Sequence, residues 1–318
     1  MKHVSAFAWI AVILLVVPAL VVPVRAETRI EKNLKLEPGG RFILDADGGA
    51  VVVRGSREAG VRVVVTSQRD DLEKLYDFKF EEGPGEVRVA ARRVPGSLWK
   101  RGVSFGFEVR VPETTGIKLH TGGGAIDVSA LRAGIELETS GGSLDISDVT
   151  GDVAAQTSGG SISVDGVKGA VRVETSGGSV HAEAVTGPLT ARTSGGSISV
   201  SGVTGDADAE TSGGPVLVRE AGGRVRAHTS GGSIEVSFAR GNGRGGDLNT
   251  SGGSVRVFLD ASVNLNLDAS TTGGSVSSDI PVLVQGKASR SSLEGKMGKG
   301  GELLRIRASG GSVRLFKM

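Results

Sequence analysis

The sequence predicts an all-β protein, built as a parallel two-sided β-solenoid with 18-residue coils and irregular β caps. Three observations lead to this fold class. The tetrapeptide T-S-G-G recurs at a fixed step, apolar residues alternate with polar ones between the glycines, and 51 of the 318 residues are glycine. A fixed period indicates a stack of similar units, alternation is typical of half-buried strands, and abundant glycine supports many tight turns.

The first 26 residues have the features of a secretory signal peptide. After a short basic start, the chain is almost wholly apolar from Val4 to Val22, and Ala26 is a small residue suited to signal peptidase. An uncleaved membrane anchor is the alternative, since a span needs about 20 apolar residues, but Pro18 and Pro23 would interrupt such a helix. We therefore expect an exported protein that begins at Glu27, with membrane contact only through a retained leader.

Charge and cysteine content exclude several functions. The chain has 37 Lys+Arg and 35 Asp+Glu. Cleavage of the leader removes Lys2 and Arg25, so the expected mature chain has 35 of each and no net charge. Nucleic-acid binding needs a localised basic surface, which this balance gives no reason to expect. No cysteine is present, so disulfides and a thioether lipid anchor are excluded.

Residues 27–120 are predicted to form an N-terminal β cap with divergent first rungs of the stack. The stretch from Asp47 to Gly55 resembles one such rung, and Asp71 to Tyr76 is the only part with helical character. A cap is expected because open sheet edges pair with other chains. The predicted strands run from Gly60 to Thr66, Phe78 to Glu82, Glu86 to Ala91 and Phe105 to Val111.

Residues 121–318 carry the solenoid repeats and a C-terminal cap. T-S-G-G units open every 18 residues from Thr139 to Thr229, and two more follow at a spacing of 21. A weaker copy opens at Thr121 and another at Ala308. Near the end, Gln285 to Gly301 is predicted to be a loop rich in Gly, Ser and Lys, followed by closing strands at Leu303–Arg307 and Ser312–Leu315.

One coil shows how the repeat becomes two strands. In TSGGSISVDGVKGAVRVE, which starts at Thr157, Ile162 and Val164 alternate with polar residues, and nine residues later Val171 and Val173 do the same. We predict two half-coils that face one interior and stack in parallel about 4.8 Å apart. An antiparallel β-sandwich is the alternative, because Gly-Gly and Asp-Gly also form hairpin turns, but the constant step favours the solenoid.

The paired glycines of the repeat are predicted to be structural turns. We expect them to adopt backbone angles that side chains resist. Counting by twos along the strand points the preceding threonine inward at the corner, where its hydroxyl can bond the turn backbone. The glycines concerned are Gly141, Gly142, Gly159, Gly160, Gly177, Gly178, Gly195 and Gly196.

Two long stretches resemble a known family. FEVRVPETTGIKLHTGGGAIDVSALRAGIELETSGGSLDIS, which begins at Phe107, and the ending GKMGKGGELLRIRASGGSVRLFKM are similar to the bacterial putative-adhesin β-strand-repeat family, a domain of unknown function. The resemblance covers about Leu36 to Met318. It implies an exported β-repeat protein with an adhesive or surface role, and it supplies no catalytic residues.

The outward positions show no catalytic, metal-binding or cofactor-binding set. One column mixes signs and sizes as an ordinary solvated sheet does, and reads Glu136, Ala154, Arg172, Thr190, Asp208, Arg226; its neighbour reads Glu138, Gln156, Glu174, Arg192, Glu210, His228. Calcium β-rolls need an aspartate in the turn, and a zinc site needs convergent ligands. A β-helix enzyme acting on polysaccharide is the alternative function, and it would need paired carboxylates in a cleft.

One loop is predicted to bind a partner. ARRVPGSLWKRGV, from Ala91 to Val103, has four basic residues, no acid and the only tryptophan after the leader. Basic and aromatic side chains together can grip anionic polymers or lipid headgroups. The alternative is a solvated cap loop with the tryptophan folded onto the core. The candidate binding residues are Arg92, Arg93, Trp99, Lys100 and Arg101.

These observations together predict an exported, non-catalytic β-repeat protein. It would act as an adhesin, a surface-binding protein or a scaffold in the periplasm, at the cell surface or outside the cell. The expected partner is a cell-surface polymer, a glycan or another envelope component, and neither nucleic acid nor a cofactor is expected.

Overall fold

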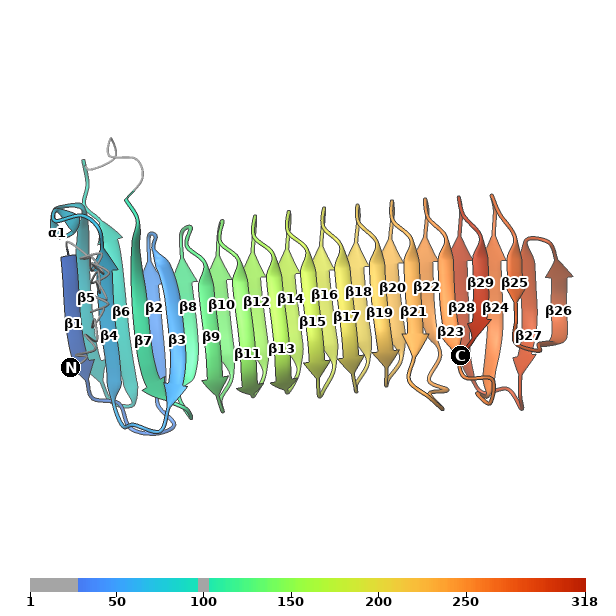
Figure 1. The fold of residues 1–318 in the computed structure, drawn as a ribbon, viewed down its shortest axis with the longest axis horizontal. Coiled ribbons are helices and arrows are strands. Elements are labelled where there is room, and N and C mark those ends of the chain that lie inside the picture. Colours follow the sequence, from blue (N-terminus) through green and yellow to red (C-terminus); the bar gives the residue numbers. More distant parts are fainter. Residues whose placement is uncertain (1–27, 97–102) are drawn as a thin grey trace, which may run out of the picture.

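The structure, a computed structural model, describes residues 28–96 and 103–318. They form one elongated β-solenoid with two sheets facing each other across an apolar interior (Figure 1). Sheet A has 14 strands and sheet B has 15, which confirms the predicted fold class. The short helix α1 (Leu72–Leu75) lies within the predicted helical stretch, and no helix of the described residues is long and apolar enough to span a membrane.

The middle of the solenoid consists of coils that follow one another in sequence order. Each coil passes through one strand of sheet B and then one of sheet A, and each strand pairs in parallel with its equivalents in the neighbouring coils, as Val171 does with Val153 and Leu189. The strands of sheet B are β8 (Gly116–Thr121), β10 (Ile135–Thr139), β12 (Val153–Thr157), β14 (Val171–Thr175), β16 (Leu189–Thr193), β18 (Ala207–Thr211), β20 (Val225–Thr229) and β22 (Gly246–Thr250). Those of sheet A are β9 (Ile126–Leu131), β11 (Leu144–Thr150), β13 (Ile162–Lys168), β15 (Val180–Val185), β17 (Ile198–Val203), β19 (Val216–Ala221), β21 (Ile234–Phe238) and β23 (Val255–Leu259).

From β9 to β19, each sheet A strand buries one more apolar residue than the alternation predicts. In β13 the inward side chains are Ile162, Val164 and also Val167. The extra position is reached because Gly166 adopts a left-handed backbone with φ of 65°, which shifts the alternation by one residue as a β-bulge does. The same left-handed position recurs in neighbouring coils at Ala130, Asp148, Ala184, Gly202 and Glu220.

The T-S-G-G corner joins each coil to the one before it. The Oγ1 of Thr175 donates to the carbonyl of Gly160 at 2.8 Å and accepts from the Gly178 N–H at 3.3 Å. Thr175 is buried, and its equivalents repeat these contacts along the stack. The predicted inward threonine is therefore confirmed.

The reason given for the glycine pairs is wrong, because none of them has a left-handed φ. Only the second glycine of a pair needs to lack a side chain. A Cβ on Gly178 would lie 2.0 Å from the carbonyl oxygen of Gly160, whereas a Cβ on Gly177 would meet nothing closer than 3.6 Å. Close stacking of successive turns, rather than backbone angle, therefore explains Gly142, Gly160, Gly178 and Gly196.

At the N-terminal end, coils are not stacked in sequence order. The coil of β2 and β3 lies between β8–β9 on one side and β6–β7 on the other, and antiparallel strands complete the cap. Tyr76, Phe78, Phe105 and Phe107 fill its interior with ring centroids 4.6–6.4 Å apart. The strands are β1 (Thr28–Leu34), β2 (Arg41–Ala46), β3 (Ala50–Ser56), β4 (Val61–Ser67), β5 (Tyr76–Gly83), β6 (Glu86–Arg93) and β7 (Phe105–Pro112).

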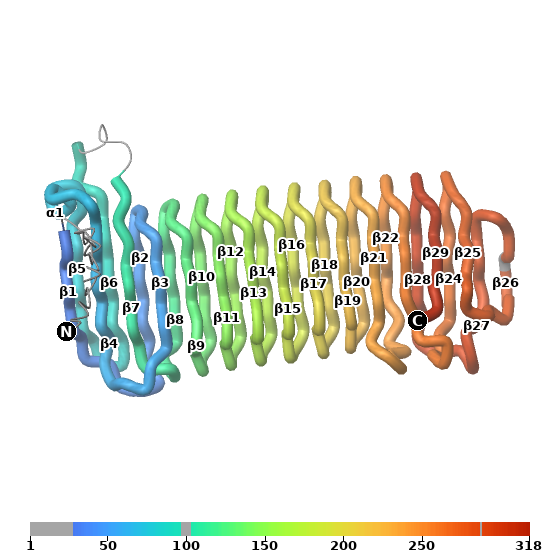
Figure 2. Tube along the Cα trace, viewed as in Figure 1, coloured from blue at the N-terminus to red at the C-terminus, as the bar shows by residue number. Residues whose placement is uncertain are grey.

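The C-terminal end repeats this arrangement. The last coil of the sequence is inserted, with β28 between β22 and β24 and β29 between β23 and β25, as the red strands of Figure 2 show. The predicted loop from Gln285 to Gly301 is wrong. Two antiparallel strands occupy most of it, because Gly295 and Met297 turn inward and their polar neighbours face solvent. The strands are β24 (Leu265–Thr271), β25 (Val276–Ser278), β26 (Leu283–Ser289), β27 (Ser292–Met297), β28 (Glu302–Ala308) and β29 (Val313–Lys317).

Candidate functional site

An open trough crosses the outward face of sheet B near its N-terminal end. It has a volume of about 690 Å³ and spans six neighbouring strands, from Arg41 on β2 to Thr190 on β16. Its lining includes small residues at or just before the starts of the strands, namely Gly116, Gly134 and Ala170. Because each coil contributes equivalent positions, the trough follows the axis of the solenoid and suits an extended ligand.

Outward side chains of the two predicted columns line this trough and the smaller hollows next to it. Lys118, Glu136 and Arg172 border the trough, and Glu174 and Arg192 border a neighbouring hollow of about 310 Å³. Lys118 Nζ lies 2.7 Å from the Glu136 carboxylate, one coil away. The sequence correctly placed these columns outward, but it gave no indication of the trough. The small residues at the starts of three of its strands, Gly116, Gly134 and Ala170, were the available signal.

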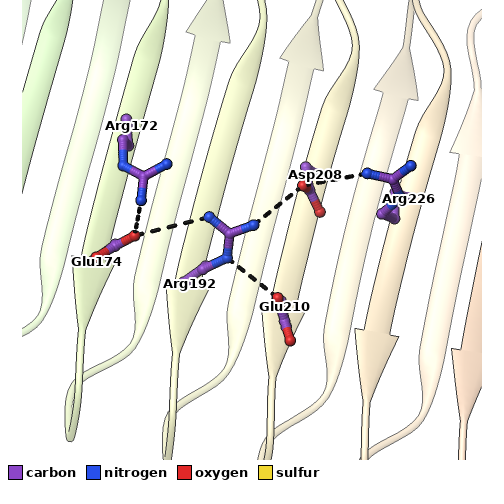
Figure 3. Close-up of polar contacts among 6 residues, drawn as sticks. All are labelled: Arg172, Glu174, Arg192, Asp208, Glu210 and Arg226. Atoms are coloured by element: carbon purple, nitrogen blue, oxygen red, sulfur yellow. Dashed lines mark hydrogen bonds and ion pairs between the residues drawn. The ribbon is translucent and has the colours of Figure 1, made fainter.

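A ladder of ion pairs crosses the adjoining coils (Figure 3). The guanidinium of Arg192 lies 3.8 Å from Glu174, 3.4 Å from Asp208 and 3.2 Å from Glu210, so it links three coils. Arg172 pairs with Glu174 at 2.5 Å, and Arg226 with Asp208 at 3.8 Å. The side chains of the ladder are 27–66% exposed, so solvent screens them and each pair contributes only about 0–1 kcal/mol to stability. The ladder therefore presents alternating charge to solvent at little cost.

The predicted binding residues at the end of β6 are held by acidic neighbours. Arg92 donates to the carboxylates of Asp45 and Asp47, and both interactions raise the pKa of Arg92. Arg93 donates from its guanidinium to the Tyr76 hydroxyl at 3.0 Å, and its guanidinium carbon lies 5.6 Å from the centre of that ring. The other three predicted residues, Trp99, Lys100 and Arg101, lie outside the described residues.

Asp47 helps to hold the C-terminal end of β6 in place through Arg92 and Arg93. Burial would raise the pKa of Asp47, but the Arg93 N–H and the Arg92 guanidinium donate to its carboxylate and keep that pKa below its ordinary value. Both donors favour the charged form of Asp47. Arg92 and Arg93 are thus part of the structure of the cap, and an anionic ligand would have to compete with two carboxylates for Arg92.

The three histidines of the described residues do not meet in one place. His120 lies 3.6 Å from Glu138 and His181 lies 3.7 Å from Glu183, on opposite sheets. Within residues 28–96 and 103–318, no group of three or more His, Cys, Asp or Glu side chains is arranged to hold a metal ion.

Comparison with known proteins identifies a family and several solved structures of low sequence identity. A family model described as Toastrack DUF4097 matches residues 100–315, more than half of the chain. No curated protein matches the sequence. Among solved structures, a "putative cell adhesion protein" from Clostridium sporogenes is 14% identical with a TM-score of 0.26, and the alignment covers 92% of this chain and 100% of that one.

Two further structures come from Parabacteroides distasonis. A "putative adhesin" is 9% identical with a TM-score of 0.38, and a "putative lipid binding protein" is 10% identical with a TM-score of 0.36. Each alignment covers 91% of this chain and 97% of the other.

Proposed function

Because this chain belongs to the Toastrack DUF4097 family, a family of β-repeat proteins whose function is unknown, we propose its role from its own surfaces. We propose that it is an exported, non-catalytic protein of the cell envelope that binds an extended surface polymer along the outward face of sheet B. The leader-like first 26 residues support export.

The trough on sheet B carries this proposal. It crosses six strands and combines both signs of charge with small residues that leave room for a chain. Pockets for small molecules bury most of the ligand surface, whereas this hollow is open along its length. A polymer that runs parallel to the solenoid axis could contact equivalent groups in successive coils, which adds many weak contacts without a deep pocket.

The state of the outward carboxylates favours binding over catalysis. Glu174, Asp208 and Glu210 each have an arginine within 3.8 Å, on the same coil or the next. Polysaccharide hydrolysis needs two carboxyl groups on opposite sides of one bond, one of them with a raised pKa. Each of these three carboxylates is instead engaged by an arginine, so this ladder suits recognition.

The basic loop is a second part of the proposal. Since Arg92 and Arg93 already have partners in the cap, we expect Trp99, Lys100 and Arg101 to contribute most of any contact that the loop makes. Changing these three to alanine should weaken binding to isolated envelopes while Arg92→Ala mainly destabilises the cap. Unchanged binding by the triple variant removes the loop from the proposal.

Fractionation of the native organism tests export. The protein should appear in the periplasmic, surface or extracellular fraction, with Glu27 as its first residue by mass spectrometry. A cytoplasmic protein that retains Met1 would contradict the proposal.

Co-sedimentation of the purified protein with isolated envelopes tests the trough. A variant with Arg41→Thr, Lys118→Thr and Arg172→Thr should bind about tenfold more weakly, because it loses three charged contacts. The matched control is Arg110→Thr, Arg219→Thr and Arg290→Thr, which removes the same charge from exposed positions outside the trough. Equal weakening of binding in both variants would indicate non-specific charge attraction and would rule out the trough as the binding site.

A further inference from the structure

Two arginines lie side by side on the outward face of sheet A, at the C-terminal end of the solenoid. Arg256 on β23 and Arg314 on β29 occupy paired positions on neighbouring parallel strands, and both are exposed. Like charges at directly paired positions repel each other. The charge-alternating ladder of sheet B avoids such a pair, so the arrangement on sheet A calls for an explanation.

The neighbours of this pair leave one arginine without a counter-charge. On the β21 side, Glu235 lies 3.5 Å from Arg256. On the other side, the position paired with Arg314 is Ser277. Within the described parts of the chain, no carboxylate forms an ion pair with Arg314. An external anion would relieve the repulsion and give Arg314 a partner.

Two phenylalanines follow on the same strands and the same face. The rings of Phe258 and Phe316 stack with centroids 4.9 Å apart and planes 17° apart. Neither ring belongs to the interior core or to the partly buried side chains packed against it. In several other coils this outward position holds a serine, at Ser129, Ser147, Ser201 and Ser237.

The stack leaves an aromatic face available. Its centroid spacing matches the distance between neighbouring strands, about 4.8 Å, so the rings stack along the solenoid axis and the outer face of Phe258 turns toward β21. The residue paired with it there is Ser237, whose side chain is too short to cover a ring. Ser237 also lines an open hollow of about 580 Å³ with Arg240 and Met318.

We propose that Arg256, Arg314, Phe258 and Phe316 form a binding site for an acidic polysaccharide. The arginines hold the carboxylate or phosphate group of a sugar unit through paired N–H donors, and the apolar face of the neighbouring pyranose ring packs on Phe258. This inference rests on the polymer-binding role proposed above and names a ligand class for it, at a second site on the opposite sheet.

The inserted last coil creates this site. Phe258 and Phe316 are neighbours only because β29 pairs with β23 rather than following β25 in the stack. The same pairing brings Arg314 beside Arg256. A saccharide chain is favoured over a lipid surface because membrane-bound faces present protruding apolar side chains, whereas both rings are half-buried on the sheet.

Titration calorimetry of the purified full chain with polygalacturonate tests the proposal, with dextran of similar length as the neutral probe. Arg314→Ser and Phe258→Ser are the diagnostic variants, since serine already occurs at both columns in other coils and the fold should tolerate it. Arg57→Thr, at an exposed position between β3 and β4 at the N-terminal end of the solenoid, removes the same charge elsewhere.

The wild type should bind polygalacturonate and not dextran. Each diagnostic variant should bind about tenfold more weakly, because Arg314→Ser loses one charge-assisted contact and Phe258→Ser loses the apolar ring face on which the sugar packs. Arg57→Thr should bind within about twofold of the wild type. Absence of binding by the wild type, or equal loss in Arg57→Thr, would overturn the site even if the envelope sedimentation succeeds. Tighter binding to phosphatidylglycerol vesicles than to polygalacturonate, lost in the same variants, would assign the patch to membranes instead.

Discussion

The middle and the ends of this solenoid use the same coil in two different ways. From β8 to β23 each coil stacks on its predecessor in sequence, and the hydrogen bond from a threonine hydroxyl to a glycine carbonyl recurs at each T-S-G-G corner. At both ends a coil is inserted between others, and antiparallel strands cover the last parallel pair. The regularly stacked coils therefore give the solenoid its length, whereas the inserted coils complete its two ends.

This difference has consequences for stability and for function. Nearest-neighbour contacts dominate in a regular stack, so the loss of one coil can be repaired by its neighbours. An inserted coil has no substitute, because the coils on either side of it are joined to other parts of the chain. Insertion also places residues of distant sequence side by side, as at Arg256 and Arg314.

The largest effect should come from comparing two deletions of similar length. Removing residues 163–180 from the middle keeps every inward column in register, and we expect the free energy of unfolding to fall by no more than about 2 kcal/mol. Removing residues 302–318 takes away five buried apolar side chains and leaves the edges of β22–β23 and β24–β25 that faced the deleted coil unpaired. That loss should be about 5 kcal/mol or more, measured by urea unfolding and limited proteolysis. Similar losses of unfolding free energy for the two deletions would show that a middle coil and the inserted last coil contribute equally to stability.

A glycine pair in the middle gives the next largest effect. Gly178→Ala should lower the free energy of unfolding by about 3 kcal/mol, the upper range for overpacking, because its Cβ would meet the Gly160 carbonyl at 2.0 Å. Gly177→Ala, one residue earlier, meets only ordinary contacts at 3.6 Å and should cost less than about 1 kcal/mol. Thermal melting of both variants checks this, and equal costs would show that stacking does not select the second glycine.

The corner threonine should have a smaller effect. Thr175→Val keeps the shape of the side chain but leaves the Gly160 carbonyl and the Gly178 N–H without their hydroxyl partner. We expect a cost of about 1–2 kcal/mol. Thr190→Val, at an outward position of the next sheet B strand, serves as the control and should be nearly neutral. A neutral Thr175→Val would mean that the hydroxyl does not link successive coils.

The smallest change in stability is expected at the sheet A positions that have a left-handed backbone. Ala184 has a φ of 53°, a conformation that costs an L-residue about 1 kcal/mol. Ala184→Gly should therefore stabilise the protein by about 0.5 kcal/mol after the greater chain entropy of glycine is subtracted. Gly166→Ala should have the opposite sign, since φ is 65° there and the nearest atom to a new Cβ is 3.5 Å away. Changes of the same sign in calorimetric melting would contradict this conformational explanation.

Features that recur from coil to coil could be predicted from the sequence. Features that depend on a local shift in the alternation, or on contacts between residues far apart in the chain, were missed. The inward pairs such as Ile162 and Val164, the outward charges and the threonine corners follow from local alternation, and the structure confirms them. The third inward position was missed because a left-handed residue shifts the alternation, although valine recurs at Val149, Val167, Val185 and Val203.

The ends were harder to predict for a physical reason. RASGGSVRLF near the C-terminus reads like any other coil, and nothing local shows that it pairs with β23 and β25 at once. The hairpin of β26 and β27 has the composition of a loop, and its pairing with β24 supplies the order that composition does not suggest. The patch of Arg314 and Phe316 depends on the same distant pairing, so sequence reasoning could not assemble it.

Paired cysteines test the inserted coil most directly, because the native chain contains none. Asn249 on β22 and Arg307 on β28 are paired outward residues, and Ser270 on β24 pairs with the far side of Arg307. Disulfides need Cα atoms within about 7 Å, which neighbouring parallel strands provide and alternate strands do not. Asn249→Cys with Arg307→Cys should form a disulfide under mild oxidation, and Asn249→Cys with Ser270→Cys should not. The reverse result would mean that the coils stack in sequence order, which would contradict both the closed end and the binding patch built upon it.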